Sequence, residues 1–119
     1  MEKILRFYLS NTDMLNHDSL YEVIAQQAQE AGLAGATVYQ GIMGYGATSK
    51  LRSNKFWELN VKYPVIVEII DEEGKLKDFL DEVLPEIHDL PKGCLVTMQN
   101  VEIVMRKKGE EIDESEGNI

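Results

Sequence analysis

The chain has 119 residues, a length typical of one domain. Hydrophobic residues make up 44% and charged residues 28%, which is ordinary for a folded domain and too apolar for a disordered chain. Acidic residues outnumber basic ones by 21 to 12, and the formal charge of −9 argues against broad binding to nucleic acid or to an anionic membrane, which needs surplus Lys and Arg.

The single cysteine, Cys94, excludes an internal disulfide and a thiolate zinc site. No stretch approaches the ~20 apolar residues of a membrane helix. The first apolar run is too short, and too interrupted by charge, for a signal peptide. We therefore expect a cytoplasmic protein without membrane insertion.

Two elements are predicted at the start of the chain. Alternating apolar side chains over residues 3–9 predict a strand, and the polar stretch 10–17 predicts a loop. A capping box formed by Ser19 and Glu22, with Asp18 as a competing cap, predicts the start of a helix. The next glycine, at position 32, is expected to end this helix.

Two further strands and a long connection are predicted in the middle of the chain. Residues 36–43 alternate as a strand, and residues 65–70 form a nearly continuous apolar strand with Pro64 at its start. The connection over 44–62 is unusually long for a compact domain, which is typical of functional or mobile loops. Parts of it are alternatively expected to extend the flanking strands into a long hairpin.

A second helix and a fourth strand are predicted near the C-terminus. Apolar residues at helical spacing follow Asp71, which is a candidate cap. Pro85 lacks a backbone donor, so we expect this helix to end near Leu84. Residues 95–106 predict the last strand, bent near Asn100.

The order strand, helix, strand, strand, helix, strand predicts an α+β, ferredoxin-like βαββαβ fold. In this fold a four-stranded antiparallel sheet carries two helices on one face. We expect one domain over residues 1–108. Residues 109–119 hold five acidic residues and no basic ones, so we expect a disordered, solubilising tail.

The glycine-rich segment 41–49 is the first candidate site. Glycines leave backbone amides open to a ligand, and successive amides form an anion-binding concavity. Thr48 and Ser49 add hydroxyl donors, while Lys50 and Arg52 add positive charge. The segment therefore suits phosphate or carboxylate, or alternatively is a turn that only shapes a hairpin.

Positive charge gathers in two places on this acidic chain. Arg106 and Lys108 would share one face of a strand and clamp phosphates, or alternatively blunt an edge against aggregation. Residues 50–62 hold four bases against Glu58 alone, which suits an anionic ligand or an acidic partner surface.

No catalytic or metal-binding constellation is evident in the sequence. His17 and His88 are far apart and lack a metal-ligand spacing, and a surface or capping role is the simpler interpretation of His17. No nucleophile motif, phosphate-binding P-loop or dinucleotide fingerprint is present. We therefore predict a protein that is not an enzyme and that has no cofactor or metal site.

Several short motifs resemble a known family. Residues 32–38 read Gly-Leu-Ala-Gly-Ala-Thr-Val and residues 41–46 read Gly-Ile-Met-Gly-Tyr-Gly. Residues 17–22 read His-Asp-Ser-Leu-Tyr-Glu, and residues 95–102 fit the family's last strand. Over residues 2–106 the chain resembles the uncharacterised "domain of unknown function" family 190, which is PII-like.

The wider resemblance is to PII signal-transduction proteins. These are homotrimers of ferredoxin-like subunits that bind adenine nucleotides in clefts between subunits, and a loop between strands two and three carries the signal to partner proteins. Their Gly-Phe-Gly is similar to residues 44–46 here, and their Val-Glu-x-x-x-Arg-x-Arg is similar to residues 101–108. The resemblance implies these ligand contacts: Gly44, Tyr45, Gly46, Thr48, Ser49, Arg106 and Lys108. It also implies an effector loop that includes Lys50, Arg52 and Lys55.

The chain departs from the family patterns at three points. PII proteins have Gly-Asp-Gly-Lys before the last strand, where residues 91–94 read Pro-Lys-Gly-Cys. Thr48 stands where PII proteins have Gln, and Asp18 stands where family 190 has Gly. A nucleoside monophosphate or a cyclic nucleotide is therefore as good a candidate as ATP.

The leading hypothesis is a homotrimeric PII-like module that binds a small anionic ligand, first of all an adenine nucleotide, and regulates a transporter or an enzyme by loop rearrangement. A second hypothesis is a CutA-like protein of metal tolerance, which would bind a divalent metal through His17, His88 or acidic side chains. A small enzyme that uses the cleft between subunits is a third. An interaction module without a ligand is the fourth.

Overall fold

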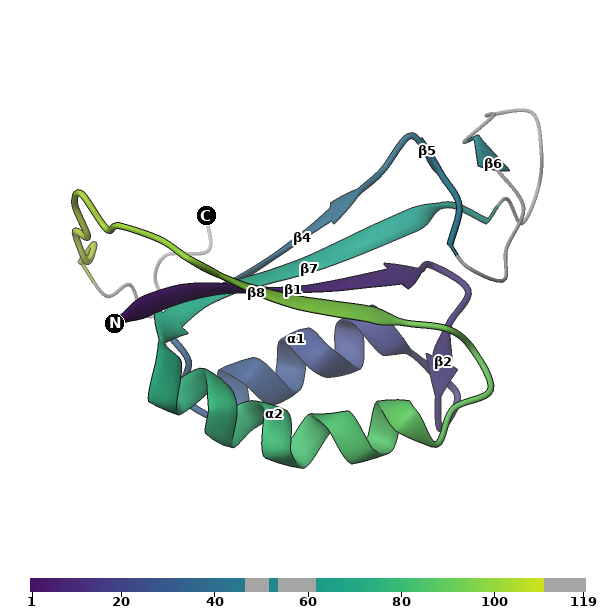
Figure 1. The fold of residues 1–119 in the computed structure, drawn as a ribbon, viewed down its shortest axis with the longest axis horizontal. Coiled ribbons are helices and arrows are strands. Elements are labelled where there is room, and N and C mark those ends of the chain that lie inside the picture. The colour runs from purple at the N-terminus through teal and green to yellow at the C-terminus, as the bar shows by residue number, and fades with distance from the viewer. Residues whose placement is uncertain (47–51, 54–61, 111–119) are drawn as a thin grey trace.

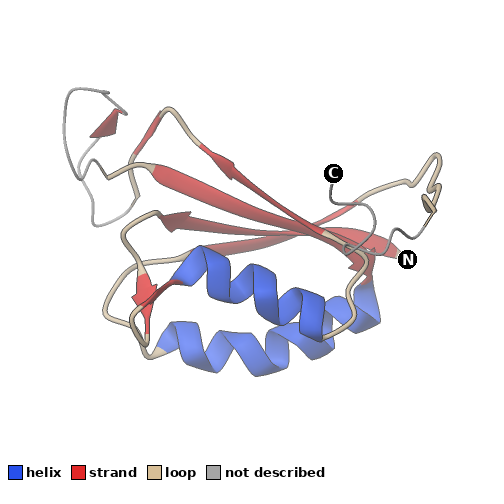
Figure 2. Cartoon of the chain, turned by 180° about the vertical axis from the view of Figure 1, so that it is seen from behind, coloured by secondary structure: helices blue, strands red, loops and turns tan. Residues whose placement is uncertain are grey.

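The structure, a computed structural model, describes residues 1–46, 52–53 and 62–110. A four-stranded antiparallel sheet in the order β4-β7-β1-β8 carries two helices on one face, and no described residue forms a layer on its other face, here called the bare face (Figures 1 and 2). This is the predicted ferredoxin-like fold. Its main elements are β1 (Glu2–Ser10), α1 (Leu20–Glu30), β4 (Ala36–Gln40), β7 (Pro64–Glu72), α2 (Glu73–His88) and β8 (Leu95–Asn100).

The core lies between the sheet and the two helices. Because strand side chains alternate, one face of β1 and one face of β7 are buried against the apolar stripes of α1 and α2. The rings of Phe7 and Phe79 meet edge to face, with centroids 6.4 Å apart. The buried apolar side chains are Leu5, Phe7, Leu9, Leu20, Ile24, Ala28, Val65, Val67, Ile69, Leu76, Phe79, Val83 and Ile87.

The sequence predicts the C-terminal end of α1 correctly but not the capping of its N-terminal end. Ser19 is the N-cap residue, but its side chain makes no capping hydrogen bond, so the predicted capping box is wrong. The predicted C-terminus is confirmed, since Gly32 has a φ of +78°. The amides of Gly32 and Leu33 donate to the carbonyls of Gln29 and Ala28, at 3.0 and 3.1 Å, which is the Schellman pattern.

Helix α2 runs through Pro85 to His88, so the predicted end at Leu84 is wrong. Pro85 removes one backbone donor, but the last turn is held in place because Ile87 is buried in the core. The N-cap residue is Glu72 instead of the predicted Asp71, which belongs to the end of β7.

Two predicted strands are shorter in the structure. The strand expected over 36–43 ends at Gln40, because the amide of Gly41 donates to the carbonyl of Pro64 at 2.8 Å and the chain then turns away. A Cβ at position 41 would lie 2.7 Å from Cγ of Pro64, so this close approach requires glycine. The strand expected over 95–106 ends at Asn100, the Cα partner of Lys3 near the start of β1, and the amide of Val101 makes one more hydrogen bond, to the carbonyl of Glu2 at 3.4 Å.

Two small hairpins extend the fold. The predicted loop 10–17 contains β2 (Met14–Leu15), which pairs with β3 (Asp18–Ser19). The turn between them has positive φ at both central residues, Asn16 and His17, as in a type I′ turn. In the long connection, β5 (Met43–Gly44) pairs with β6 (Arg52–Ser53) as a separate two-stranded sheet, so this hairpin does not extend the flanking strands β4 and β7. Within the described ranges, no helix is long and apolar enough to cross a membrane.

Candidate functional site

The glycine segment lies at the end of the sheet where β1 finishes. Pro64, the Cα partner of Ser10, lies beside Gly44, where an added Cβ would be 3.3 Å from Cγ of the proline. The Tyr45 side chain is 75% exposed next to it. The accessible rim at this end consists of Gly44, Tyr45 and Gly46. It begins at the end of β5 and leads into the long connection (Figure 1).

Arg106 lies at the opposite end of the sheet. Its Nη1 donates to Oε1 of Glu2, the first residue of β1, at 2.8 Å. The nine residues of β1 separate this contact from the glycine end by about 26 Å, at about 3.3 Å per residue. One chain therefore does not bring Gly44 and Arg106 together. Arg106 and exposed Lys108 also lie outside any strand, so the predicted shared strand face is wrong.

Several predicted site residues cannot be placed. Thr48, Ser49, Lys50 and Lys55 lie outside the described residues. Arg52 belongs to β6, and its Cα partner is Gly44. The base of the predicted effector loop is therefore attached to the glycine segment through the backbone.

A hydrogen-bonded loop that sequence reasoning missed supports the glycine end. Oδ1 of Asn11 accepts the amide of Tyr63 at 2.7 Å, and the amide of Asn11 donates to the Tyr63 carbonyl at 3.1 Å. Buried Asp13 accepts the amide of Ser10 at 2.9 Å. These contacts fix the chain as it enters β7. Asn and Asp side chains in a polar stretch are the usual signal for such turns.

The thiol of Cys94 lies in a setting that disfavours its thiolate form. Burial, followed by the nearby negative charge of Asp13, raises the pKa of Cys94 to about 11. Because the thiolate is the reactive form, this raised pKa disfavours nucleophilic chemistry at Cys94 near neutral pH. Its side chain is partly buried and packs against the core.

A polar belt crosses the bare face of the sheet, with one residue from each of the four strands. Oε2 of Glu68 accepts from Tyr39 Oη at 3.2 Å and from Arg6 Nε at 2.9 Å, and Arg6 also donates to Gln99. The hydrogen bond with Glu68 raises the pKa of Arg6. No single stretch of sequence signals this belt, because its members meet only across strands.

Apolar side chains flank this belt on the bare face. The strand registers place them on the same side as Arg6: Ile4, Tyr8, Ile66, Ile70 and Leu95. Leu95 is 59% exposed, and nothing in the described part of the chain forms a second layer over this face (Figure 2). An apolar face of this kind is a candidate interaction surface.

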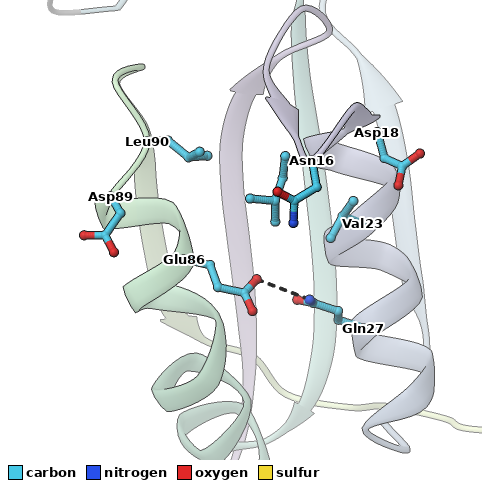
Figure 3. A pocket seen from close by; sticks show the side chains of 8 residues that line it. Asn16, Asp18, Val23, Gln27, Glu86, Asp89 and Leu90 are labelled. Atoms are coloured by element: carbon cyan, nitrogen blue, oxygen red, sulfur yellow. Dashed lines mark hydrogen bonds between the residues drawn. The ribbon is translucent and has the colours of Figure 1, made fainter.

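A cavity of about 430 Å³ lies between α1, α2 and the β2–β3 hairpin, and none of the predicted ligand residues lines it (Figure 3). Gln27 Nε2 donates to Glu86 Oε2 at 3.3 Å across it. Three carboxylates and no cation line the cavity, so it does not suit an anion. Its lining consists of Leu15, Asn16, Asp18, Val23, Gln27, Glu86, Asp89 and Leu90.

The two histidines are not part of a metal-binding group. His17 lies in the β2–β3 turn, and His88 ends α2 with Nδ1 3.7 Å from a carboxylate oxygen of Asp89. Over residues 1–46, 52–53 and 62–110, no three His, Cys, Asp or Glu side chains are placed to hold one ion. The described residues therefore give the CutA-like hypothesis no support.

Solved structures share this fold. CPII, a nitrogen regulatory PII-like protein from Thiomonas intermedia K12 bound to ADP, AMP and bicarbonate, is similar with a TM-score of 0.58. The identity is 16%, over 84% of this chain and 87% of that chain. A de novo designed protein, Foldit4, is similar with a TM-score of 0.52 at 13% identity, over 86% of this chain and 100% of that one. These likenesses show the fold alone.

Sequence comparisons identify relatives and a family. A UPF0166 protein from Aquifex aeolicus is 38% identical over 103 residues, which is 87% of this chain and 93% of that protein. A UPF0166 protein from Methanocaldococcus jannaschii is 34% identical over 91 residues, or 76% and 80% of the two chains. The model of the family DUF190, "Uncharacterized ACR", matches residues 2–103. The chain therefore belongs to the DUF190 family and has its PII-like, ferredoxin-like fold.

Proposed function

We propose that this protein is a PII-like signalling module that binds a small anionic ligand, first of all an adenine nucleotide, between copies of itself. The observation that carries the proposal is the separation of the two candidate half-sites. The glycine rim at Gly44–Gly46 and the cations Arg106 and Lys108 lie at opposite ends of one sheet. A second copy could supply the half that each end lacks. The ADP and AMP bound to CPII, which has the same fold, support a nucleotide as the ligand.

The proposed assembly is a homotrimer that covers the bare face of the sheet. This face combines apolar side chains with a polar belt whose charges are already balanced, Arg6 against Glu68. Such a surface can be buried without leaving an unpaired charge. The segment after β8 also exposes Val104 and Met105, at 93% and 78%, which would be covered if this segment lay on a neighbouring copy.

The residues around the rim suggest a ligand with few phosphates. The exposed ring of Tyr45 offers a flat apolar face for a base, and the glycines on either side of it have no side chain to keep an anion away from the backbone. Residues 91–94 lack the first glycine and the aligned lysine that PII proteins use for phosphates, and only Gly93 matches. We therefore rank AMP, ADP and cyclic nucleotides with ATP, and include bicarbonate because CPII binds it.

The proposed output is a change in the loop between β4 and β7. This loop contains the bases Lys50, Arg52 and Lys55, and an acidic partner surface is the matching chemistry. A ligand that contacts the rim differently in two loop states shifts their populations, which would regulate a transporter or an enzyme in the cytoplasm. The module itself carries out no reaction in this proposal.

Calorimetry and thermal shift on the purified full chain test the proposal. The panel is AMP, ADP, ATP, cyclic AMP, bicarbonate and divalent metals, with adenosine as the uncharged control. A nucleotide at 100-fold over its Kd should add about 2.7 kcal/mol to the free energy of unfolding. Binding that is lost in Arg106→Ala supports the proposal. A response to metals alone, or to nothing in the panel, contradicts it.

A further inference from the structure

The carboxylate of Glu2 is the partner of Arg106 within one chain. Oε1 of Glu2 accepts from Nη1 of Arg106 at 2.8 Å. Its second oxygen, Oε2, is buried and has no hydrogen-bond partner among the described residues. The Glu2 side chain is 19% exposed and the Arg106 side chain 50% exposed. A carboxylate in this setting depends on its cation, because burying an unpaired charge is costly.

Two lysines near this end of the sheet pair with a different carboxylate. Lys77 Nζ lies 3.1 Å, and Lys3 Nζ 3.9 Å, from Oε1 of Glu73. Lys3 also donates to the side chain of Asn100. The two lysines thus form ion pairs with Glu73, while Arg106 forms an ion pair with Glu2. An anion that reaches Arg106 therefore meets a cation whose charge is already offset by a fixed carboxylate.

From this geometry we propose that Glu2 is an intrachain competitor that holds Arg106 and opposes anion binding to it. The inference rests on the proposed function, because it takes Arg106 as a ligand contact. Binding of a phosphate to Arg106 must either displace the Glu2 carboxylate or accept it as a neighbouring like charge. In both cases the carboxylate weakens binding, and more so for a ligand with more negative charge. The Glu2–Arg106 pair therefore lowers the affinity for anionic ligands, and most of all for those with the most negative charge.

The test compares Glu2→Gln with a matched control, Glu72→Gln. Glu72 is the Cα partner of Glu2 on β7 and is exposed, so both variants remove one negative charge at neighbouring backbone positions. Gln keeps an oxygen that accepts a hydrogen bond, which preserves the local packing. We expect Glu2→Gln to bind ADP about fivefold more tightly, as for one partly exposed ion pair, while Glu72→Gln stays near wild type. Adenosine should bind equally to all three proteins.

A double-mutant cycle separates competition from a structural effect. In an Arg106→Ala background, where ADP binding is already lost, Glu2→Gln should not restore it, because no guanidinium remains to be released. Weaker ADP binding by Glu2→Gln would overturn the inference and make Glu2 a residue that positions Arg106. Equal gains in Glu2→Gln and Glu72→Gln would also overturn it and leave the proposed function standing. If none of the proteins binds any nucleotide, the proposed function fails and the inference fails with it.

Discussion

At the residue scale, Asp71 links two parts of the chain that are distant in sequence. Its side chain is only 4% exposed, with Oδ2 accepting the amide of Ala34 at 2.8 Å and Oδ1 accepting the amide of Glu72 at 2.7 Å. The sequence suggested a local cap, since Asp before an apolar stripe is the usual cap signal. The hydrogen bond from Ala34, which is distant in sequence, could not be predicted, because it depends on where the loop before β4 passes in space.

Asp71→Ala should lower the free energy of unfolding by about 2–3 kcal/mol, because it leaves two backbone amides without their acceptor. Urea unfolding measured by circular dichroism checks this. Asp71→Asn is the matched control, and it should lose less because its amide oxygen still accepts one of the two bonds. Equal stability of Asp71→Ala and wild type would contradict the role given to these contacts.

The thiol of Cys94 gives a pH-dependent prediction. Because burial disfavours the thiolate, its pKa rises to about 11, and the rate of alkylation by iodoacetamide should climb with pH until that region. The free energy of unfolding should fall as pH increases above the ordinary thiol pKa, since the unfolded chain loses this proton first. Cys94→Ala should remove that part of the slope. An alkylation midpoint near pH 8.5 would contradict the burial argument.

At the element scale, the types and order of the main elements could be predicted from the sequence, and their ends could not. Apolar periodicity directly records which side chains face the core, so it gave both helices and all four main strands. The ends depend on neighbours. The last strand stops at Asn100, close to the start of its neighbour β1, and α2 passes Pro85 because Ile87 packs in the core.

Pro85→Ala should stabilise the protein by about 1–2 kcal/mol, because α2 already has helical geometry at this position and alanine restores the missing backbone donor. The midpoint of urea unfolding is the measurement. Pro91→Ala is the control, since Pro91 lies outside any helix or strand. A loss of stability in Pro85→Ala would show that the proline ring makes contacts that outweigh the lost hydrogen bond.

At the scale of the whole molecule, the position of the candidate site relative to the fold was the part that the sequence could not provide. The motifs at residues 44–46 and 106–108 are each readable as anion-binding. That they lie at opposite ends of the sheet follows from the length and direction of β1, which no motif encodes. The polar belt from Tyr39 to Gln99 was missed for the same reason, because it exists only after four strands are aligned.

The separation of the half-sites predicts complementation between two defective chains. Gly44→Val and Arg106→Ala should each lose nucleotide binding, and refolding them together should restore about a quarter of the sites if copies mix at random. Calorimetric titration of the mixture gives the number of sites. Each variant refolded alone is the control. A mixture that binds no more than either variant would show that both halves act within one chain.

A molecule with complementary features at its two ends also faces a geometric choice. In a head-to-tail contact, each added copy binds one end of its neighbour and leaves its own other end free to bind a further copy. Such a contact can therefore repeat without limit. If the rotation between copies closes, the result is a ring without free ends. If a substitution at the contact changes that rotation, the same chemistry would polymerise the protein into filaments. The angle between neighbouring sheets is then as important for solubility as any single side chain.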